Sequence, residues 1–503
     1  RWTAAGDEAD PARAPSLAFL DWLPTAAAYV VGRPGSVLVL GSAGGLEVLG
    51  ALRHGADSVT GVELVGPLVE VTGWVLGEGA DLYRRRGVRP VVGDARAFAA
   101  EAEERFDVVV LPPAGRFGVA AAGVYAAGED YMSTVEAFAD YLERLAPGGV
   151  LAITGWLRTP PRNGAKTLLT AVRALRLAGV EEPGGSLVFL RSWATGTLLV
   201  KPDGFAPEEL DRVRAFALER RVDVDWPPPP EGAEPPTFNR MERPVFRQAA
   251  AAAAAGPDSA RAWAARYPFH VAPATDDRPY AHRFLRLSSL PELLSRGRGA
   301  MLPVAEWGYL AVVATLFQSG LLAALLLLVP AAVLVARRGD GPPLDGTRSG
   351  LARTAGYFGA IGLGFALVEI TAIQRLGLVL GHPVYATSAA LAALLAFSGL
   401  GSWASDRWEA GRGARACLAV GIGALVGAAL IPRAGVLLPL PFGARMTLGG
   451  VAVGGLGFLM GWPFPTGLRR LAGRGAPVAW AWAANGFASV VGVSLATLLA
   501  MEL

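Results

Sequence analysis

The chain has 503 residues, 52% of them hydrophobic and 18% charged, with a formal net charge of +3 at pH 7. This length is too great for one compact core, and the shortage of charge points away from an ordinary soluble protein. No basic stripe interleaved with aromatic residues is present, so we expect no nucleic-acid partner, and one cysteine with four histidines leads us to expect no disulfide framework and no metal site.

The chain begins with Arg1-Trp2 and shows no signal-peptide pattern, so we expect a processed or incomplete start. The first half then alternates strands and helices. The apolar run at 36–40 predicts a strand buried on both faces, and it is followed by the glycine-rich turn Gly41–Gly45 and a helix at 46–53. A second strand at 58–62 ends at Glu63.

This order has a known chemical use. In a Rossmann-like unit the glycines let the backbone approach a ligand, and an acid about 20 residues further on holds ribose hydroxyls. Glu63 occupies that place. The alternative is a tight turn followed by a solvent-exposed glutamate.

Further strands complete the pattern. A third strand at 91–95 carries Asp94, a fourth follows at 106–111, and a fifth at 150–154 comes after a helix at 136–145. Alternation of this kind predicts a doubly wound parallel sheet, with ligands bound beyond the carboxyl ends of the strands. We assign residues 1–225 to this α/β domain.

Residues 226–300 are predicted to connect the two halves. They contain the proline run Pro227–Pro230, an alanine-rich helix at 249–255, and the polar segment Asp276-Asp277-Arg278-Pro279. That segment could carry function. The favoured interpretation is a turn that locks the soluble domain onto the membrane surface.

Residues 301–503 are predicted to form a polytopic α-helical membrane domain, because a spanning helix needs about 20 mainly apolar residues. Six segments are candidates, at 307–336, 352–378, 384–405, 416–431, 446–468 and 478–501. The fourth is the shortest. Buried helices of a large soluble protein are disfavoured, since the segments are too long and follow one another too closely.

Polar and irregular residues occur inside these helices. Glu369 should face a partner or a cavity, because a charge in lipid is expensive, and the alternative is a structural ion pair with an arginine from a neighbouring helix. Pro463 and Pro465 predict a break near the end of the fifth helix, and Asn485-Gly486 predicts an interruption of the sixth. The polar candidates of this half are Glu369, Arg375, His382 and Asn485.

The orientation in the membrane stays open. Arginine-rich loops after the first, third and fifth helices mark one face, and positive residues mark cytoplasmic loops. One helix separates the soluble domain from the first of these loops, so the domain would lie on the side opposite the cytoplasm. A nucleoside ligand, however, is found in the cytoplasm.

The motifs are shared with a known group of proteins. They are Val37–Gly45, Gly61–Glu63, Gly93–Ala95, Tyr131–Phe138, Leu145–Leu151, Pro273–Pro279, Glu369, Leu380–Pro383, Phe397–Ser402 and Asn485-Gly486. The chain resembles Class I S-adenosylmethionine-dependent transferases, and more closely the membrane-fused spermidine synthase-like proteins of bacteria. The resemblance implies an integral multi-pass protein of the bacterial plasma membrane.

The resemblance also implies roles for single residues. The turn Gly41–Gly45, with Ala43 in place of its middle glycine and Gly44 and Gly45 after it, would cradle the methionine end of S-adenosylmethionine or its decarboxylated form. Glu63 would hold the ribose, and Asp94 with Ala95 would contact the adenine.

The catalytic acid is where this chain departs from the family. Spermidine synthases carry an aspartate after the fourth strand that acts as base toward the attacking amine, but here the segment is Leu111-Pro112-Pro113-Ala114. Asp130 and Tyr131 of the next loop, beside Glu129, are the remaining catalytic candidates. Their alternative role is to cap the helix that begins near Ser133.

Two functions follow. The first is a membrane-bound transferase that passes an aminopropyl or methyl group to a small amine or a membrane-resident acceptor. The second is a catalytically degenerate domain that serves as scaffold or sensor for a transporter-like or accessory membrane module, or as a subunit of a larger membrane complex.

Overall fold

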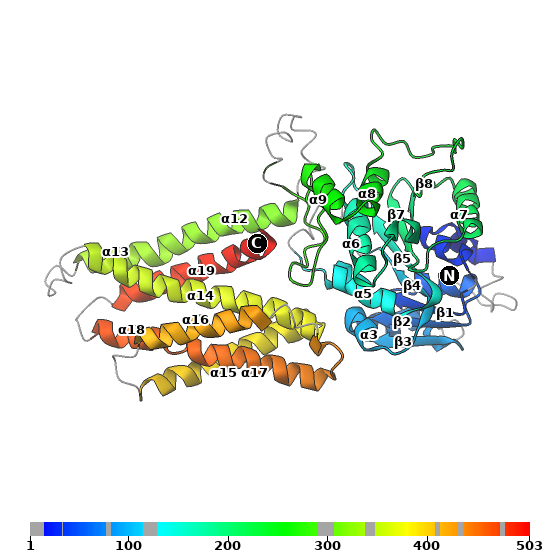
Figure 1. Cartoon of the computed structure of the whole chain (residues 1–503). Helices are drawn as coiled ribbons and strands as arrows, with labels where there is room; N and C mark the ends of the chain where they lie inside the picture. Colours follow the sequence, from blue (N-terminus) through cyan, green and yellow to red (C-terminus); the bar gives the residue numbers. More distant parts are fainter. Residues whose placement is uncertain are drawn as a thin grey trace. The chain divides into compact units, whose positions relative to one another are not determined.

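The computed structural model describes residues 15–32, 34–76, 82–113, 128–286, 288, 306–337, 348–407, 413–430, 436–472 and 478–502. Residues Arg1–Trp307 and Gly308–Leu503 form two compact units, which are described separately. Figure 1 shows the elements of both, coloured along the chain.

The first unit is built on one eight-stranded sheet in the order β3-β2-β1-β4-β5-β7-β6-β8. The strands are β1 (Ser36–Leu40), β2 (Ser58–Glu63), β3 (Val88–Val92), β4 (Phe106–Leu111), β5 (Leu145–Trp156), β6 (Leu187–Arg191), β7 (Thr195–Val200) and β8 (Asp223–Trp226). The first five pair in parallel and the last three add antiparallel pairs. The predicted Rossmann-like sheet is confirmed, and it is extended by three antiparallel strands that the sequence pattern did not predict.

Helices cover both faces of this sheet. They are α1 (Leu46–Arg53), α2 (Gly66–Leu76), α3 (Ala95–Glu101), α5 (Val135–Glu143), α6 (Asn163–Leu177), α7 (Pro207–Arg220), α8 (Val245–Ala254) and α9 (Pro257–Arg266). Short helical turns add η2 (Pro15–Trp22), η3 (Pro24–Val30), η4 (Leu82–Arg84), η6 (Tyr131–Ser133) and η7 (Pro183–Ser186). The central strands are apolar on both faces because both are covered, and Val37, Leu38 and Val39 of β1 are fully buried.

The second unit is helical. Its helices are α12 (Trp307–Ala323), a π-helical turn η9 (Ala324–Leu328), α13 (Val329–Arg337), α14 (Arg348–Leu380), α15 (Pro383–Ser405), α16 (Gly413–Leu430), α17 (Phe442–Met460), α18 (Pro463–Ala472) and α19 (Val478–Glu502). Five stretches of the described chain are long and apolar enough to span a membrane: Trp307–Ala336, Gly350–Leu380, Pro383–Ser405, Phe442–Ala472 and Val478–Glu502. The predicted fourth span forms α16, a helix of 18 residues that is not among these five stretches.

Two local predictions for the second unit have opposite outcomes. The break predicted near the end of the fifth helix is confirmed, because α17 ends at Met460 and α18 begins at Pro463. The interruption at Asn485-Gly486 is wrong, because α19 runs unbroken through both residues. The Asn485 amide donates to the carbonyl of Phe358 in α14 at 3.1 Å, so this polar side chain joins two helices instead of ending one.

Glycines bring α15 and α17 into backbone contact. A Cβ at Gly401 would lie 2.0 Å from the carbonyl oxygen of Phe458, and one at Gly461, just after α17, would lie 2.1 Å from that of Ser398. In α14, a Cβ at Gly362 would lie 2.3 Å from the carbonyl oxygen of Asn485. Small residues at these positions therefore set how closely the helices approach.

We predict that Gly401→Ala destabilises the helical unit by about 1–3 kcal/mol, because the added methyl group forces α15 away from α17. Gly399→Ala is the matched control on the same helix, since nothing lies within 4 Å of a Cβ there. Thermal unfolding of both variants in detergent would measure the difference. Equal melting temperatures would show that the close approach is unimportant.

Candidate functional site

The glycine-rich turn between β1 and α1 has an unusual backbone. Gly41 and Gly45 have φ of 87° and 82°, and Ala43 has φ of 41°. A left-handed conformation costs a residue with a Cβ about 1–2 kcal/mol. The N–H groups of Gly41 and Ser42 both donate to the carbonyl of Val62 at 2.9 Å, so the turn is fixed to the end of β2.

Glu63 holds this turn from the carboxyl end of β2. Its Oε2 accepts a hydrogen bond from the N–H of Ala43 at 2.8 Å, and its Oε1 accepts one from the N–H of Val65 at 2.9 Å. The side chain is 7% exposed. The alternative of a solvent-exposed glutamate is therefore wrong. Each carboxylate oxygen already has a backbone donor and keeps a second lone pair for a further donor.

Tyr83 supports the turn from the interior, a role that the sequence did not indicate. Its hydroxyl donates to Ser42 Oγ at 3.0 Å and to the carbonyl of Ala43 at 3.1 Å. Leu82 packs so closely that a Cβ at Gly45 would lie 2.3 Å from its Cδ2. Burial raises the pKa of Tyr83, so the phenol remains a neutral donor.

Asp94 and Ala95 lie where β3 passes into α3. Asp94 caps that helix, with Oδ1 accepting from the N–H of Ala97 at 2.8 Å, and Ala95 is buried. The cap explains why an acid follows the strand at this point, since N-terminal N–H groups need an acceptor. The third strand was predicted at 91–95, but β3 spans Val88–Val92. Asp94 and Ala95 therefore lie beyond the strand and not within it.

Asp130 is tied to a residue that the sequence reasoning missed, His282. Asp130 Oδ2 lies 3.2 Å from His282 Nε2, and Oδ1 accepts from the N–H of Met132 at 3.0 Å. Burial by itself raises the pKa of Asp130, but the hydrogen bond and charge of His282, with the Met132 N–H, outweigh it and hold the pKa below its usual value. Asp130 is therefore a carboxylate that orients an imidazole.

The predicted capping role is partly correct. Asp130 caps the short turn Tyr131–Ser133, which carries the other catalytic candidate, Tyr131, while α5 begins at Val135 and is capped by Thr134. In the sequence, His282 could have been noticed because it lies three residues after Pro279, just beyond the shared motif Pro273–Pro279.

Arg96 fastens the segment that leads to His282. Its guanidinium is 3% exposed and forms ion pairs with Asp140 of α5 and with Asp276, the latter at 3.3 Å. Asp276 Oδ1 also accepts from the Thr134 hydroxyl at 2.7 Å, and its N–H donates to Glu136 Oε2 at 3.0 Å. The segment Pro273–Pro279 is thus a turn locked onto α3 and α5 of the first unit itself.

Acids predominate around these groups. The charges of Asp94, Asp130 and Asp276 all act on Tyr141, whose pKa is raised chiefly by burial. Nearby, burial and the charge of Asp276 raise the pKa of Glu136. Arg96 acts against these acids at both groups, so this region combines several carboxylates with one buried guanidinium.

A second charged cluster lies deeper in the unit. The basic side chains Arg158, Arg162, Lys166 and Arg283 are at most 6% exposed. Glu306, at 0%, acts on the first three of them by its charge, and Asp130 also acts on Lys166. Lys166 Nζ donates to the carbonyls of Tyr280 at 2.8 Å and Arg283 at 3.2 Å. Burial lowers the pKa of Lys166 to about 7. Sequence reasoning missed the cluster because its members lie as far apart in the sequence as Arg158 and Glu306.

The polar candidates of the helical unit do not form one site. No hydrogen bond or ion pair joins any two of Glu369, Arg375, His382 and Asn485. Within the described ranges Glu369 has neither kind of partner, so the alternative of an ion pair with an arginine is wrong there. His382 caps α15 through Nδ1, which accepts from the N–H of Val384 at 3.2 Å.

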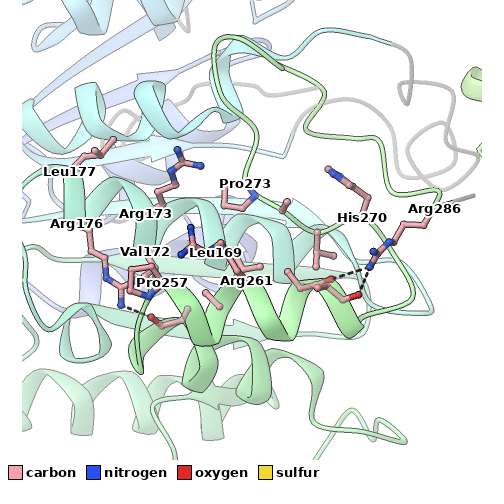
Figure 2. Close-up of a pocket in the computed structure, with 16 residues that line it drawn as sticks. Leu169, Val172, Arg173, Arg176, Leu177, Pro257, Arg261, His270, Pro273 and Arg286 are labelled. Atoms are coloured by element: carbon pink, nitrogen blue, oxygen red, sulfur yellow. Dashed lines mark hydrogen bonds between the residues drawn. The ribbon is translucent and has the colours of Figure 1, made fainter. Parts of the chain in front are cut away.

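A cavity of about 620 Å³ lies elsewhere in the first unit, and none of the predicted site residues lines it. Figure 2 shows the residues around it. It is lined by α6, α8, α9 and the residues that follow α9.

Comparison with known proteins adds little. No family model matches the chain, and no curated protein matches it. Solved structures that are similar include a spermidine synthase from Thermotoga maritima, at 14% identity over 50% of this chain and 74% of that one, with a TM-score of 0.28. A probable spermidine synthase from Corynebacterium glutamicum gives 20% identity, 46% and 77% coverage, and a TM-score of 0.29. A SAM-dependent methyltransferase from Agrobacterium tumefaciens is 17% identical over 37% of this chain and 62% of that one, with a TM-score of 0.26. TM-scores this low support no argument about function.

We predict that Lys166→Met flattens the pH dependence of stability above pH 7. In the folded protein the pKa of Lys166 is about 7, against 10.5 for an ordinary lysine, so between these values the unfolded chain binds more protons. The free energy of unfolding contributed by this group therefore rises with pH across that window, and below it the full penalty of the buried charge remains. Melting temperatures of both proteins from pH 6 to 10 would measure this. Parallel curves would contradict it.

Proposed function

We propose that the first unit binds S-adenosylmethionine or its decarboxylated form at the carboxyl ends of β1, β2 and β3. The observation that supports this most directly is the contact of Glu63 with Ala43, which joins an acid to the glycine-rich turn. Glu63 would hold the ribose, and the turn would receive the methionine end of the ligand. Asp94 and Ala95, at the start of α3, would contact the adenine.

The proposed reaction transfers an aminopropyl or methyl group to an amine, either a small molecule or a membrane-resident acceptor. The amine nitrogen attacks the carbon bonded to the sulfonium, so that a C–N bond forms, the C–S bond breaks and a neutral thioether leaves. The new ammonium group must then lose a proton. His282, oriented by Asp130, would take it. The surrounding acids favour an acceptor whose attacking nitrogen is neutral and whose second, non-reacting amine carries the positive charge.

This assignment changes the part given to Asp130. A carboxylate with a lowered pKa, already bonded to an imidazole and a backbone N–H, is a weak proton acceptor. A neutral imidazole whose other contacts hold it in place is the commonest general base in proteins, so His282 is the better candidate. Asp130 is therefore a positioning residue in this proposal. Tyr131 remains a catalytic candidate only because it lies on the turn Tyr131–Ser133, which Asp130 caps.

The five apolar stretches support a multi-pass protein of the bacterial plasma membrane, and the enzyme would act at that membrane. The competing function is a degenerate domain that serves a transporter-like or accessory helical module. It is favoured by the absence of an acid among the described residues Leu111–Pro113 and by the partnerless Glu369.

We expect wild-type protein to bind S-adenosylmethionine, its decarboxylated form or methylthioadenosine in calorimetry. Glu63→Ala should weaken that binding by about 10- to 100-fold, since hydrogen bonds to a charged group contribute about 1.5–3 kcal/mol. Glu104→Ala is the control, because that carboxylate is exposed and pairs with Arg89. No binding to wild type would exclude the enzyme function and leave the scaffold.

The transfer step has its own test. We expect His282→Ala to lower kcat by about 100- to 10,000-fold while the affinity for the nucleoside stays unchanged, because only the proton acceptor is lost. Asp130→Asn should give a smaller loss, since the amide can still contact the ring. Product formation with a panel of amines would be measured by mass spectrometry. A His282→Ala enzyme with full activity would remove the imidazole from the mechanism.

A further inference from the structure

The 620 Å³ cavity has the construction of a binding site, although it lies away from the strand ends. Its volume falls within the range of small-molecule pockets. Aliphatic side chains of α6 form one wall, with Leu169, Val172 and Leu177 spaced along one face of the helix. Small residues of α9, including Ala260 and Ala264, form another and leave the interior open.

Four arginines stand around these apolar walls, and the lining contains no aspartate or glutamate. They are Arg173, Arg176, Arg261 and Arg286. In the view of Figure 2, Arg176 and Arg286 lie toward opposite ends of the row of lining residues. The cavity is therefore apolar in its body and cationic at its margins.

The structure holds two of these guanidinium groups in place while leaving them capacity to bind. Arg176 donates from Nη2 to the carbonyl of Ala253 at 2.7 Å. Arg286 donates from Nη1 to the carbonyls of Ala264, Ala265 and Tyr267 at 3.2, 2.7 and 2.9 Å. Their other nitrogens make no hydrogen bond within the described residues. A planar group fixed on one side presents its remaining donors in a geometry that suits a carboxylate or phosphate.

The other two arginines differ in their partners. Arg173 is exposed and makes no hydrogen bond or ion pair with any described residue. Arg261 pairs with the exposed Asp258, which does not line the cavity. Positive charge thus exceeds negative charge at this hollow, and an anion would relieve the imbalance.

We propose that this cavity binds a single-chain anionic lipid, with its hydrocarbon chain against α6 and α9 and its carboxylate or phosphate among the arginines. Apolar walls alone would accept any hydrophobe, and arginines alone would accept any anion. The combination selects a molecule that has both parts. A membrane lipid is the committed source, because the same chain has five stretches that are long and apolar enough to span a membrane. This proposal is independent of S-adenosylmethionine binding.

The test uses the full-length protein in nanodiscs of zwitterionic phosphatidylcholine. Dodecanoate is titrated below its micelle concentration and its binding is followed by calorimetry. Dodecan-1-ol tests the need for charge, and inorganic phosphate tests the need for a chain. We expect dodecanoate to bind at least 10-fold more tightly than either.

Two variants locate the binding. Arg173→Gln should weaken dodecanoate binding by about 10-fold without altering the melting temperature, because this side chain makes no internal bond. Arg214→Gln, an exposed arginine of α7 that pairs with Asp211, should bind as wild type does. Ala260→Phe, which fills the hollow, should abolish binding in a protein that still binds nucleoside or still unfolds cooperatively.

Three results would overturn the proposal. Equal affinity for dodecan-1-ol would show that the arginines do not select the ligand. Equal affinity for inorganic phosphate would make this a site for a free anion. Absence of dodecanoate binding to wild type, or its persistence in Ala260→Phe, would show that no lipid occupies the cavity.

Discussion

The buried guanidinium of Arg96 is the contact on which the proposed site depends. It lies on α3, two residues after Asp94, and it pairs with Asp140 of α5 and with Asp276 of the segment that leads to His282. This side chain joins three separate parts of the chain, and the N–H of Asp130, which donates to the carbonyl of Pro279 at 2.7 Å, holds the same segment beside Asp130. A buried cation that loses a partner destabilises the protein by about 3–5 kcal/mol. We therefore expect the loss of either ion pair of Arg96 to destabilise the first unit.

The first unit keeps its charges in separate places. Asp94, Asp130 and Asp276 act together on Tyr141, whereas Arg158, Arg162 and Lys166 are buried near Glu306 and other arginines surround the cavity beside α6. Such a separation creates a field across the unit that neither cluster would produce alone. A cationic acceptor and an anionic lipid would therefore be drawn to different surfaces.

Local sequence patterns were sufficient for some of this architecture. The apolar runs of β1 and β4, the turn Gly41–Gly45 and the break before Pro463 all follow from short-range rules, and the structure contains each of them. Long-range contacts were beyond such rules. His282 meets Asp130 across more than 150 residues, and the cavity joins α6 to α9. Asn485 was misjudged because an asparagine–glycine pair often ends a helix, yet here its amide bonds to α14.

Glu306 belongs to the first unit through its contacts, although in the sequence it lies at the very end of that unit. This carboxylate is fully buried among cations and accepts from the N–H of Phe284 at 2.7 Å, yet it immediately precedes the first apolar helix. A soluble fragment cut before this residue would contain the entire sheet but would lack the counter-ion of its deepest charges. We therefore expect a fragment of the first unit to be more stable when it extends through Glu306.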